Sequence, residues 1–324
     1  MAGKLNASSL VTIYGGSGFV GRHLVQALAR TGCRMRIAVR RPDLAGHLQP
    51  LGSVGQIHAV QANLRYPDSV LRAAEGADAV VNLVGILHES GKQRFEDIHV
   101  AGAGVIARAA KAAGVDTVVH LSAIGADPRS PSRYARSKAG GEKAMLKTFP
   151  GAVIMRPSVI FGPEDDFFNR FAALARIAPV LPLFGGGRTR FQPVYVSDVA
   201  QAIRIALEGG CKPGTIYELG GPEILTLREI FERVLHYTGR RRPLVPVPFA
   251  VATVMAWFLQ LLPNPMLTVD QVKLLKQDNI VDRVAVVQKR TLAGLGIDPV
   301  PVDAVVGSYL ERFRPRGEFA PLNG

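Results

Sequence analysis

The feature that most constrains this chain of 324 residues is a glycine triplet close to its beginning. The apolar run Leu10 to Tyr14 predicts a buried strand, and Gly15, Gly18 and Gly21 follow it with the spacing G-x-x-G-x-x-G. The next residues repeat apolar side chains with the period of a helix. A strand, a glycine turn and a helix are the parts of a dinucleotide-binding βαβ unit.

Each glycine has a physical role in such a unit. Gly15 lets the chain leave the strand sharply, Gly18 lets the backbone approach a pyrophosphate, and Gly21 lets the helix pack closely. The open N–H groups of the first helical turn then face the phosphates. A glycine-rich turn without a ligand is the alternative, but the strand and helix on either side favour a nucleotide site.

Composition limits the class of protein. A hydrophobic content of 48% is ample for a core, and two cysteines cannot form a disulfide framework, so they indicate a reducing compartment. No cluster of histidines and cysteines has metal-ligand spacing, and we predict no metal. The first ten residues lack the apolar core of a signal peptide and are too short and poor in basic residues for a transit peptide, so we expect a cytoplasmic protein.

The net charge of +13 predicts an anionic partner. Membrane lipid, nucleic acid and an acidic protein surface are the candidates. We expect no nucleic-acid partner, because no motif of interleaved basic and aromatic residues stands out. A basic surface without any partner is the alternative.

Apolar strands alternate with helical segments through the first half of the chain. The predicted strands are 10–14, 35–39, 57–61, 79–85, 117–122 and 152–156. This alternation predicts an α/β fold, a doubly wound parallel Rossmann sheet with a smaller C-terminal α/β domain. We assign 1–156 to the nucleotide-binding core and 157–324 mainly to the small domain, with a segment at about 190–215 returning to the core.

The end of the second strand selects the cofactor. Arg40 stands where an acid would bind the ribose 2′-hydroxyl, and no acid competes before Asp43. Because arginine favours a 2′-phosphate, the sequence predicts NADP(H) over NAD(H). The alternative is that Arg40 and Arg41 are ordinary surface charges.

The second half is less regular, and we expect a loop over 163–193. Capping boxes at Thr226 and Thr268 predict two helix starts. Residues 249–262 are apolar apart from Thr253 and Gln260, and predict a helix of about 21 Å, which is too short to span a bilayer. This helix is either buried against the domain or lies on a membrane surface.

Tyr134 and Lys138 are spaced i, i+4 and share one face of a predicted helix. A lysine beside a phenol lowers the phenol's pKa, which allows proton exchange near neutral pH. Ser122, at the end of the preceding strand, can hydrogen-bond a substrate carbonyl. These three candidate catalytic residues predict proton transfer coupled to hydride transfer. The alternative is a surface tyrosine with a solvated lysine.

These motifs resemble the extended, atypical short-chain dehydrogenase/reductase superfamily, of the NAD-dependent epimerase/dehydratase kind. The glycine motif, Ser122, Tyr134 with Lys138, and the segment 156–162 carry the resemblance, which runs from about 11 to 310. A narrower resemblance, carried by 132–143, 161–169 and 192–199, is to the nucleotide-binding accessory subunit of respiratory complex I, of the alpha-subcomplex subunit 9 type, and its bacterial relatives.

The resemblance implies a Rossmann domain with a tightly held NADPH and a structural role where the matrix arm meets the membrane. Complex I subunits and an anionic membrane are then the expected partners, and the expected place is the cytoplasm, peripheral to the inner face of the membrane. Carried over by position, the cofactor residues are Gly15, Ser17, Gly18, Phe19, Val20 and Gly21 at the pyrophosphate, Arg40 and Arg41 at the 2′-phosphate, Asn63 near the adenine, Leu83, Val84 and Gly85 along the ribose, and Tyr134, Lys138 and Pro157 at the nicotinamide riboside.

Two departures from the family pattern bear on turnover. Ser122 and Tyr134 are only 12 residues apart, which is shorter than usual, and His99 stands where active relatives carry an asparagine. We therefore expect an NADP(H)-binding accessory component of membrane-bound NADH:quinone oxidoreductase. The alternative is an active NADPH-dependent oxidoreductase or epimerase for a nucleotide sugar or a quinone-related substrate.

Overall fold

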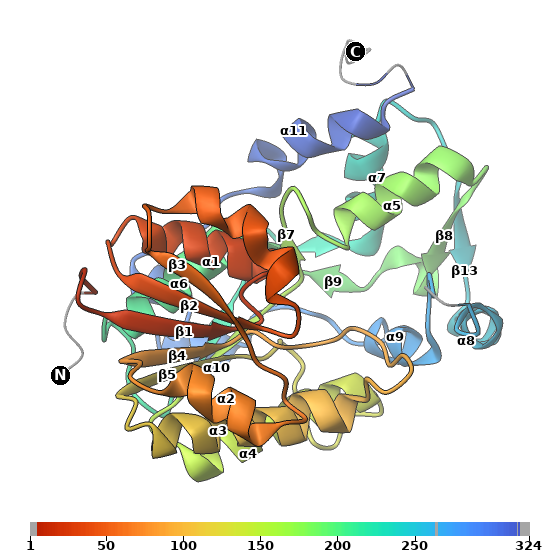
Figure 1. The fold of residues 1–324 in the computed structure, drawn as a ribbon. Coiled ribbons are helices and arrows are strands. Elements are labelled where there is room, and N and C mark those ends of the chain that lie inside the picture. The colour runs from red at the N-terminus through yellow and green to blue at the C-terminus, as the bar shows by residue number, and fades with distance from the viewer. Residues whose placement is uncertain (1–4, 263–264, 316, 318–324) are drawn as a thin grey trace. The chain divides into compact units, whose positions relative to one another are not determined.

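The computed structural model describes residues 5–262, 265–315 and 317, and its chain divides into two compact units (Figure 1). The first unit comprises Met1–Pro157, Ser197–Leu219 and Arg283–Ile297. The second comprises Ser158–Val196, Gly220–Asp282 and Asp298–Gly324. The chain therefore leaves the first unit and returns to it twice. The assignment of 1–156 and 157–324 to separate domains stays a prediction.

The first unit is built on a seven-stranded sheet in which every strand pairs in parallel with its neighbours. Its strand order is β11-β6-β5-β4-β1-β2-β3, so the order reverses direction between β1 and β4. The strands are β1 (Leu10–Tyr14), β2 (Arg34–Val39), β3 (Ile57–Gln61), β4 (Ala79–Asn82), β5 (Thr117–Leu121), β6 (Val153–Pro157) and β11 (Ile216–Leu219). The predicted doubly wound Rossmann sheet is confirmed.

Helices cover the sheet on both faces, with α1 on one face and α2, α3 and α4 on the other (Figure 1). The helices of this unit are α1 (Phe19–Ala29), α2 (Pro67–Ala74), α3 (Gly102–Ala112), α4 (Arg133–Thr148), α6 (Val196–Leu207) and α10 (Arg283–Val287). Pro67 at the first turn of α2 has its φ preset for a helix, and Ser132 caps α4 by accepting from the Ala135 N–H at 3.2 Å.

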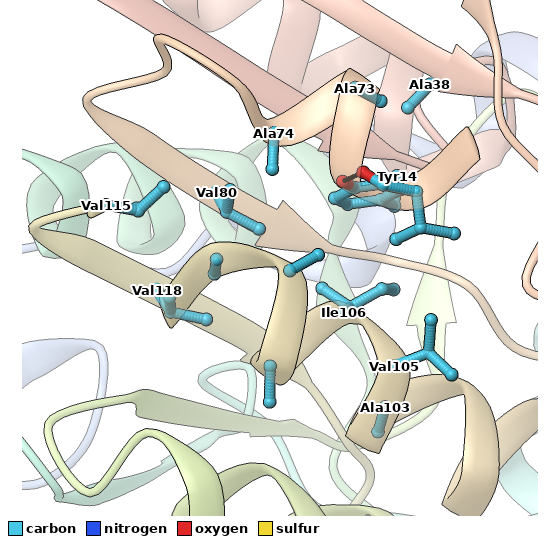
Figure 2. Close-up of a cluster of buried hydrophobic side chains, with 14 of the residues drawn as sticks. Tyr14, Ala38, Ala73, Ala74, Val80, Ala103, Val105, Ile106, Val115 and Val118 are labelled. Carbon is cyan, nitrogen blue, oxygen red and sulfur yellow. Dashed lines mark hydrogen bonds between the residues drawn. The ribbon is translucent and has the colours of Figure 1, made fainter. Parts of the chain in front are cut away.

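The core on the α2–α3–α4 face consists mainly of small and β-branched side chains (Figure 2). Alanines dominate the inward side of α3, which lets this helix approach the sheet and its neighbours closely. Tyr14 is the large exception: it is buried to 1% exposure, and its hydroxyl donates to the Val70 carbonyl at 2.5 Å. That hydrogen bond satisfies the one polar atom of the side chain inside the core.

The helical segment between β4 and β5 is not α-helical throughout. Residues Glu96–Ala101 form a π-helical segment, and α3 continues from Gly102. Such segments are uncommon and are frequent at functional sites. His99 lies in it and faces α4, where Gly141 has no side chain and the His99 carbonyl occupies the space of a Cβ. The sequence pattern missed this change of helix type because the apolar period hardly differs.

The second unit contains three short strand pairs and five helices of four residues or more in its described part. Its elements are β7 (Ile160–Phe161), α5 (Phe168–Ile177), β8 (Leu181–Phe184), β9 (Arg190–Phe191), β10 (Val194–Tyr195), β12 (Leu225–Thr226), α7 (Leu227–Tyr237), β13 (Leu244–Val247), α8 (Phe249–Leu259), α9 (Val269–Leu274) and α11 (Val306–Leu310). One cluster of buried residues joins α5, α7 and α11, and a smaller one joins α8 and α9.

Two expectations for this half are corrected and two are confirmed. The loop expected over 163–193 contains α5 and β8, and the buried residues of α5 had the helical spacing that should have revealed it. The helix predicted over 249–262 ends at Leu259. Both capping boxes are present, Thr226 with Glu229 and Thr268 with Gln271.

The outer edge of the sheet is closed by a distant piece of the chain. β11 is an edge strand, and the N–H of Glu218 in it donates to the carbonyl of Arg290 at 3.0 Å. The guanidinium of Arg290 in turn donates to the carbonyl of Ile216. Backbone groups that would otherwise lie open at the edge are therefore paired.

We expect the substitution Gly141→Ala to destabilise the first unit. An added Cβ would collide with the His99 backbone, and overpacking of this kind costs about 1–3 kcal/mol. Urea denaturation followed by circular dichroism measures the change in the free energy of unfolding. Lys143→Ala, at an exposed position of the same helix, is the control. Equal stability of the two variants would show that α4 can move away from the π-helical segment without cost.

Candidate functional site

The glycine turn after β1 has the geometry that its sequence predicts. Gly15 has a φ of +78°, its N–H donates to Ala38 at 3.0 Å, and its carbonyl accepts from Gly18 at 3.1 Å. Gly21 lies against the backbone of Gly16, with no room for a Cβ. The chain therefore folds back tightly before α1 begins at Phe19.

The N-terminus of α1 is open. Gly18 at the N-cap supplies no side chain, is exposed, and the first turn contains no acidic residue. Ser17, Phe19 and Val20 are partly exposed around it. Free N–H groups and the positive end of the helix dipole are the features that bind a phosphate. The cradle therefore fits the pyrophosphate of a dinucleotide.

The segment after β4 lies directly beside this turn. A Cβ on Gly15 would lie 3.2 Å from the backbone nitrogen of Val84, and Leu83 donates its N–H to the Tyr14 carbonyl at 2.9 Å. Gly85 is exposed at the end of the same segment. The structure thus brings the predicted pyrophosphate and ribose residues together at the carboxyl ends of neighbouring strands, where ligands of such sheets bind.

The residues expected at the two outer parts of the cofactor lie at the ends of β2 and β3. Arg40 is exposed and has no ion-pair partner in the described part of the chain. Arg41 is paired with Asp43 at 2.7 Å. The Asn63 side chain accepts from the Arg65 N–H at 3.1 Å, which leaves its amide N–H groups for a ligand. Of the two arginines, Arg40 is the one free to meet a phosphate.

Ser122, Tyr134 and Lys138 gather at the end of β5. Lys138 Nζ donates to the carbonyl of Leu121 at 3.4 Å and lies 5.8 Å from the centre of the Tyr134 ring. Ser122 is 4% exposed, and its Oγ has no hydrogen-bond partner among the residues that the structure describes. A buried hydroxyl without a partner is costly, so this atom fits a ligand that would satisfy it.

The predicted lowering of the Tyr134 pKa is not seen. Burial raises the pKa of Tyr134 to about 12, and burial lowers the pKa of Lys138 to about 8. Loss of water drives both shifts, and the carboxylate of Glu142 only partly offsets it for Lys138. Near neutral pH, Tyr134 therefore keeps its proton in this structure.

His99 orders the groups behind Tyr134. Its Nε2 accepts from the Ile86 N–H at 3.0 Å, so its proton must be on Nδ1, which donates to Ser137 Oγ at 2.8 Å. Ser137 Oγ in turn donates a hydrogen bond to the Tyr134 carbonyl at 2.7 Å. Burial, with the nearby charge of Lys138, lowers the pKa of His99 to about 3, so this imidazole stays neutral.

A second buried histidine was missed by the sequence analysis. His120 and Asn82 are at matching positions on β5 and β4, and Asn82 donates to His120 Nδ1 at 2.9 Å. The Nε2–H of His120 is buried without a described partner, and burial lowers the pKa of His120 to about 3. Two polar residues in otherwise apolar strands were the available signal.

An ion pair joins α4 to strand β6 of the sheet. The guanidinium of Arg156 on β6 donates to both carboxylate oxygens of Glu142, at 2.8 and 2.7 Å. Glu142 follows Lys138 by one helical turn and is 5% exposed. A bidentate pair of this kind sets the rotation of the helix on the sheet, and with it the direction of Tyr134 and Lys138. Pro157 is buried at the end of the same strand.

The sequence profile of the "NAD dependent epimerase/dehydratase family" matches residues 11–220. This range contains the glycine turn, the buried histidines and every predicted site residue. The chain belongs to this family. A nicotinamide dinucleotide is therefore the class of cofactor that the cradle serves.

Similar proteins extend the comparison. The chain is 36% identical to "NADH dehydrogenase [ubiquinone] 1 alpha subcomplex subunit 9, mitochondrial" of Arabidopsis thaliana over 86% of this chain and 73% of that protein. It is 32% identical to "Ceramide reductase" of Caulobacter vibrioides over 78% of this chain and 79% of that protein. The NADPH-bound quinone oxidoreductase QOR2 of Escherichia coli superposes with a TM-score of 0.74 at 20% identity, covering 93% of this chain and 99% of that structure.

The structure also limits other kinds of site. Within the described ranges, no group of three histidine, cysteine or acidic side chains is placed to hold a metal ion. In the same ranges, no helix is both long enough and apolar enough to cross a membrane.

Because burial lowers the pKa of both His99 and His120, we expect the protein to lose stability in acid. A histidine whose pKa is lower folded than unfolded takes up its proton only on unfolding, so stability falls as pH drops from about 6.5 toward 3. We expect the substitution His120→Asn to remove up to about 1.4 kcal/mol per pH unit of this dependence. Urea denaturation of both proteins between pH 7 and 4 measures it. Parallel curves would contradict a neutral His120.

Proposed function

We propose that this protein holds NADP(H) and serves as an accessory, structural or assembly component of a membrane-bound NADH:quinone oxidoreductase. The observation that carries the proposal is the 36% identity to the plant alpha subcomplex subunit 9, which extends over 86% of the chain. A match of this length includes both units, so it concerns more than the nucleotide cradle. The environment of Tyr134 supports a holding role, because a pKa of about 12 keeps its hydroxyl protonated near neutral pH.

The preference for NADP(H) rests on the end of β2. Arg40 is exposed and unpaired in the described chain, and no carboxylate lies at that strand end to bond a ribose hydroxyl or to repel a 2′-phosphate. Asp43, the nearest acid, is occupied by Arg41. The remaining cofactor residues would serve NAD(H) and NADP(H) equally.

When bound, the nicotinamide supplies or accepts a hydride. The residues of this chain would do the holding: the glycine turn at the pyrophosphate, Leu83 to Gly85 along the ribose, and Tyr134 with Lys138 at the nicotinamide riboside. The buried hydroxyl of Ser122 would gain a hydrogen-bond partner from the bound ligand. His99 keeps Tyr134 oriented without adding a charge.

The proposed partners are subunits of that oxidoreductase and an anionic membrane surface. The proposed place is the cytoplasm, peripheral to the inner face of the membrane. The relatives named as complex I subunits support the first partner, and the net charge of +13 supports the second.

A second candidate is an NADPH-dependent reductase or epimerase acting on a small substrate such as a nucleotide sugar or a quinone-related lipid. The assembled Ser122, Tyr134 and Lys138, with the buried hydroxyl of Ser122 lacking a described partner, favour it. One relative, 32% identical to this chain, is named as a ceramide reductase.

Migration on native gels separates these two functions. Under the accessory function, we expect the chain in mildly solubilised membranes of its source cells to migrate with NADH dehydrogenase activity. Tyr134→Phe should leave both migration and activity unchanged, because it removes only the hydroxyl. Gly18→Val, which fills the cradle, should reduce both. Migration of the wild-type chain apart from the NADH dehydrogenase activity would favour the reductase or epimerase function. So would a reductase activity that Tyr134→Phe abolishes without changing the migration.

The cofactor preference has its own test. We expect the substitution Arg40→Ala to weaken NADPH binding by roughly ten- to a hundredfold, since a hydrogen bond to a charged group contributes about 1.5–3 kcal/mol. NADH binding should hardly change, because NADH has no 2′-phosphate. Arg41→Ala is the matched control, since Arg41 is already paired. Calorimetric titration of the wild type and both variants with each cofactor measures the six affinities, and an equal effect of Arg40→Ala on NADH and NADPH would remove Arg40 from the site.

A further inference from the structure

Helix α8 of the second unit exposes an unusual amount of apolar surface. Its fully buried residues are Ala252 and Ala256, which lie one turn apart in a cluster with Val272 of α9, and Phe249 and Leu259 pack partly against the same cluster. Figure 1 shows α8 beside β13 in the second unit. We name as the α8 surface its exposed large apolar side chains and those of the following turn, which are between 38% and 72% exposed: Val251, Val254, Met255, Trp257, Phe258, Leu261 and Leu262.

The α8 surface offers almost no polar group. Residues 243–269 contain no charged side chain. The hydroxyl of Thr253 is turned back onto the Phe249 carbonyl at 2.7 Å. Protein interfaces carry specific hydrogen bonds among their apolar contacts, and the apolar side chains of the α8 surface offer none. Lipid needs only apolar contact from a helix that lies in its interface.

Cations stand at both ends of this uncharged segment. Arg240, Arg241 and Arg242 precede it, and Lys273 and Lys276 follow it, with Asp270 as the one acid in that range. The Lys276 ammonium lies 5.7 Å from the centre of the Phe249 ring, at the beginning of α8. Apolar side chains between flanking cations complement an anionic bilayer, whose headgroups lie above its hydrocarbon.

A basic hollow adjoins the same helix. It has a volume of about 450 Å³ and contains no acidic side chain in its wall; its lining is Gly186, Gly187, Arg188, Arg190, Thr226, Arg228 and Pro246. Arg188 has no ion-pair partner within the described ranges, and Arg228 reaches Glu232 only at 3.9 Å. Arg190 is occupied by Asp278 at 2.6 Å. Two guanidinium groups are therefore available to an anion.

The hollow and α8 belong to one surface because short contacts join them. Pro246 in the wall of the hollow is three residues before the first residue of α8. Gly185, next to the hollow, lies against the Phe249 ring with no room for a Cβ. A phosphate in the hollow would therefore be close to the N-terminal end of an apolar helix.

We propose that α8 lies flat on an anionic phospholipid bilayer, with the α8 surface among the acyl chains and a lipid phosphate held by Arg188 and Arg228 in the adjoining hollow. The helix is about 16 Å long, so it can lie in the interface but cannot cross it. This deepens the peripheral location of the proposed function by naming the element and the lipid chemistry. It requires neither the cofactor nor another subunit.

Trp257 makes the proposal testable on the unaltered protein, because it is the only tryptophan of the chain. We expect vesicles of phosphatidylcholine with phosphatidylglycerol to shift its emission to shorter wavelength and to shield it from an aqueous quencher. Vesicles of phosphatidylcholine alone should have a much smaller effect. An emission spectrum unchanged by both kinds of vesicle would overturn the proposal.

Variants then separate the two parts of the surface in a vesicle flotation assay. Val254→Asp with Phe258→Asp should abolish flotation, while Val54→Asp, at an exposed valine of the first unit, should not. Arg188→Gln with Arg228→Gln should weaken binding to anionic vesicles about thirtyfold, at about 1 kcal/mol per cation. Arg72→Gln with Lys111→Gln, two exposed cations of the first unit, is the control.

Two further outcomes would count against the proposal. If the wild-type protein dimerises in sedimentation velocity, and the aspartate variants at 254 and 258 abolish dimerisation while vesicles do not compete, a second copy covers α8. If the arginine variants bind as the wild type does, the hollow does not hold a lipid phosphate. Vesicle binding with failure to migrate with the oxidoreductase would uphold this inference and reject the proposed partner complex.

Discussion

The structure depends first on a backbone contact that only glycine permits. The first turn of α1 lies against the Gly16 backbone because Gly21 has no side chain, and Gly15 adopts a φ of +78° so that the chain can reach this position. The N-terminus of α1 then opens at the carboxyl end of β1, next to the backbone of Val84. The other proposed cofactor residues lie at the ends of neighbouring strands. Their positions relative to this helix N-terminus are fixed, because the sheet fixes those strand ends relative to β1.

Beneath this cradle the two buried histidines remain uncharged. His99 has both ring nitrogens occupied with a single consistent proton position, and burial together with the charge of Lys138 lowers its pKa. A proton relay works best when its groups have pKa values near the working pH. Tyr134, with its pKa at about 12, lies far from that condition in this structure. Rigid holding of a ligand needs no such matching, so the same residues can be retained for orientation.

The sheet and the glycine turn could be predicted because they depend on local patterns: apolar runs, glycine spacing and capping residues. The π-helical segment around His99 could not, since its hydrogen bonds shift by one residue while its apolar period barely changes. The pairing of Asn82 with His120 needs the register between two strands, which a sequence pattern does not contain. The expected effect of Lys138 on Tyr134 failed for another reason: spacing shows proximity, but burial decided the pKa of both groups.

The return of the chain to the first unit has a consequence for solubility. A β-strand at the margin of a sheet is a template on which a second molecule can add a strand and begin to aggregate. Arg290 pairs the exposed backbone groups of β11, because it accepts a hydrogen bond from the Glu218 N–H and donates one to the Ile216 carbonyl. Because Arg290 follows β11 by more than seventy residues, a nascent or proteolytically clipped chain that lacks residues 283–297 would present an unguarded strand. The segment therefore acts as a built-in protection against intermolecular strand addition.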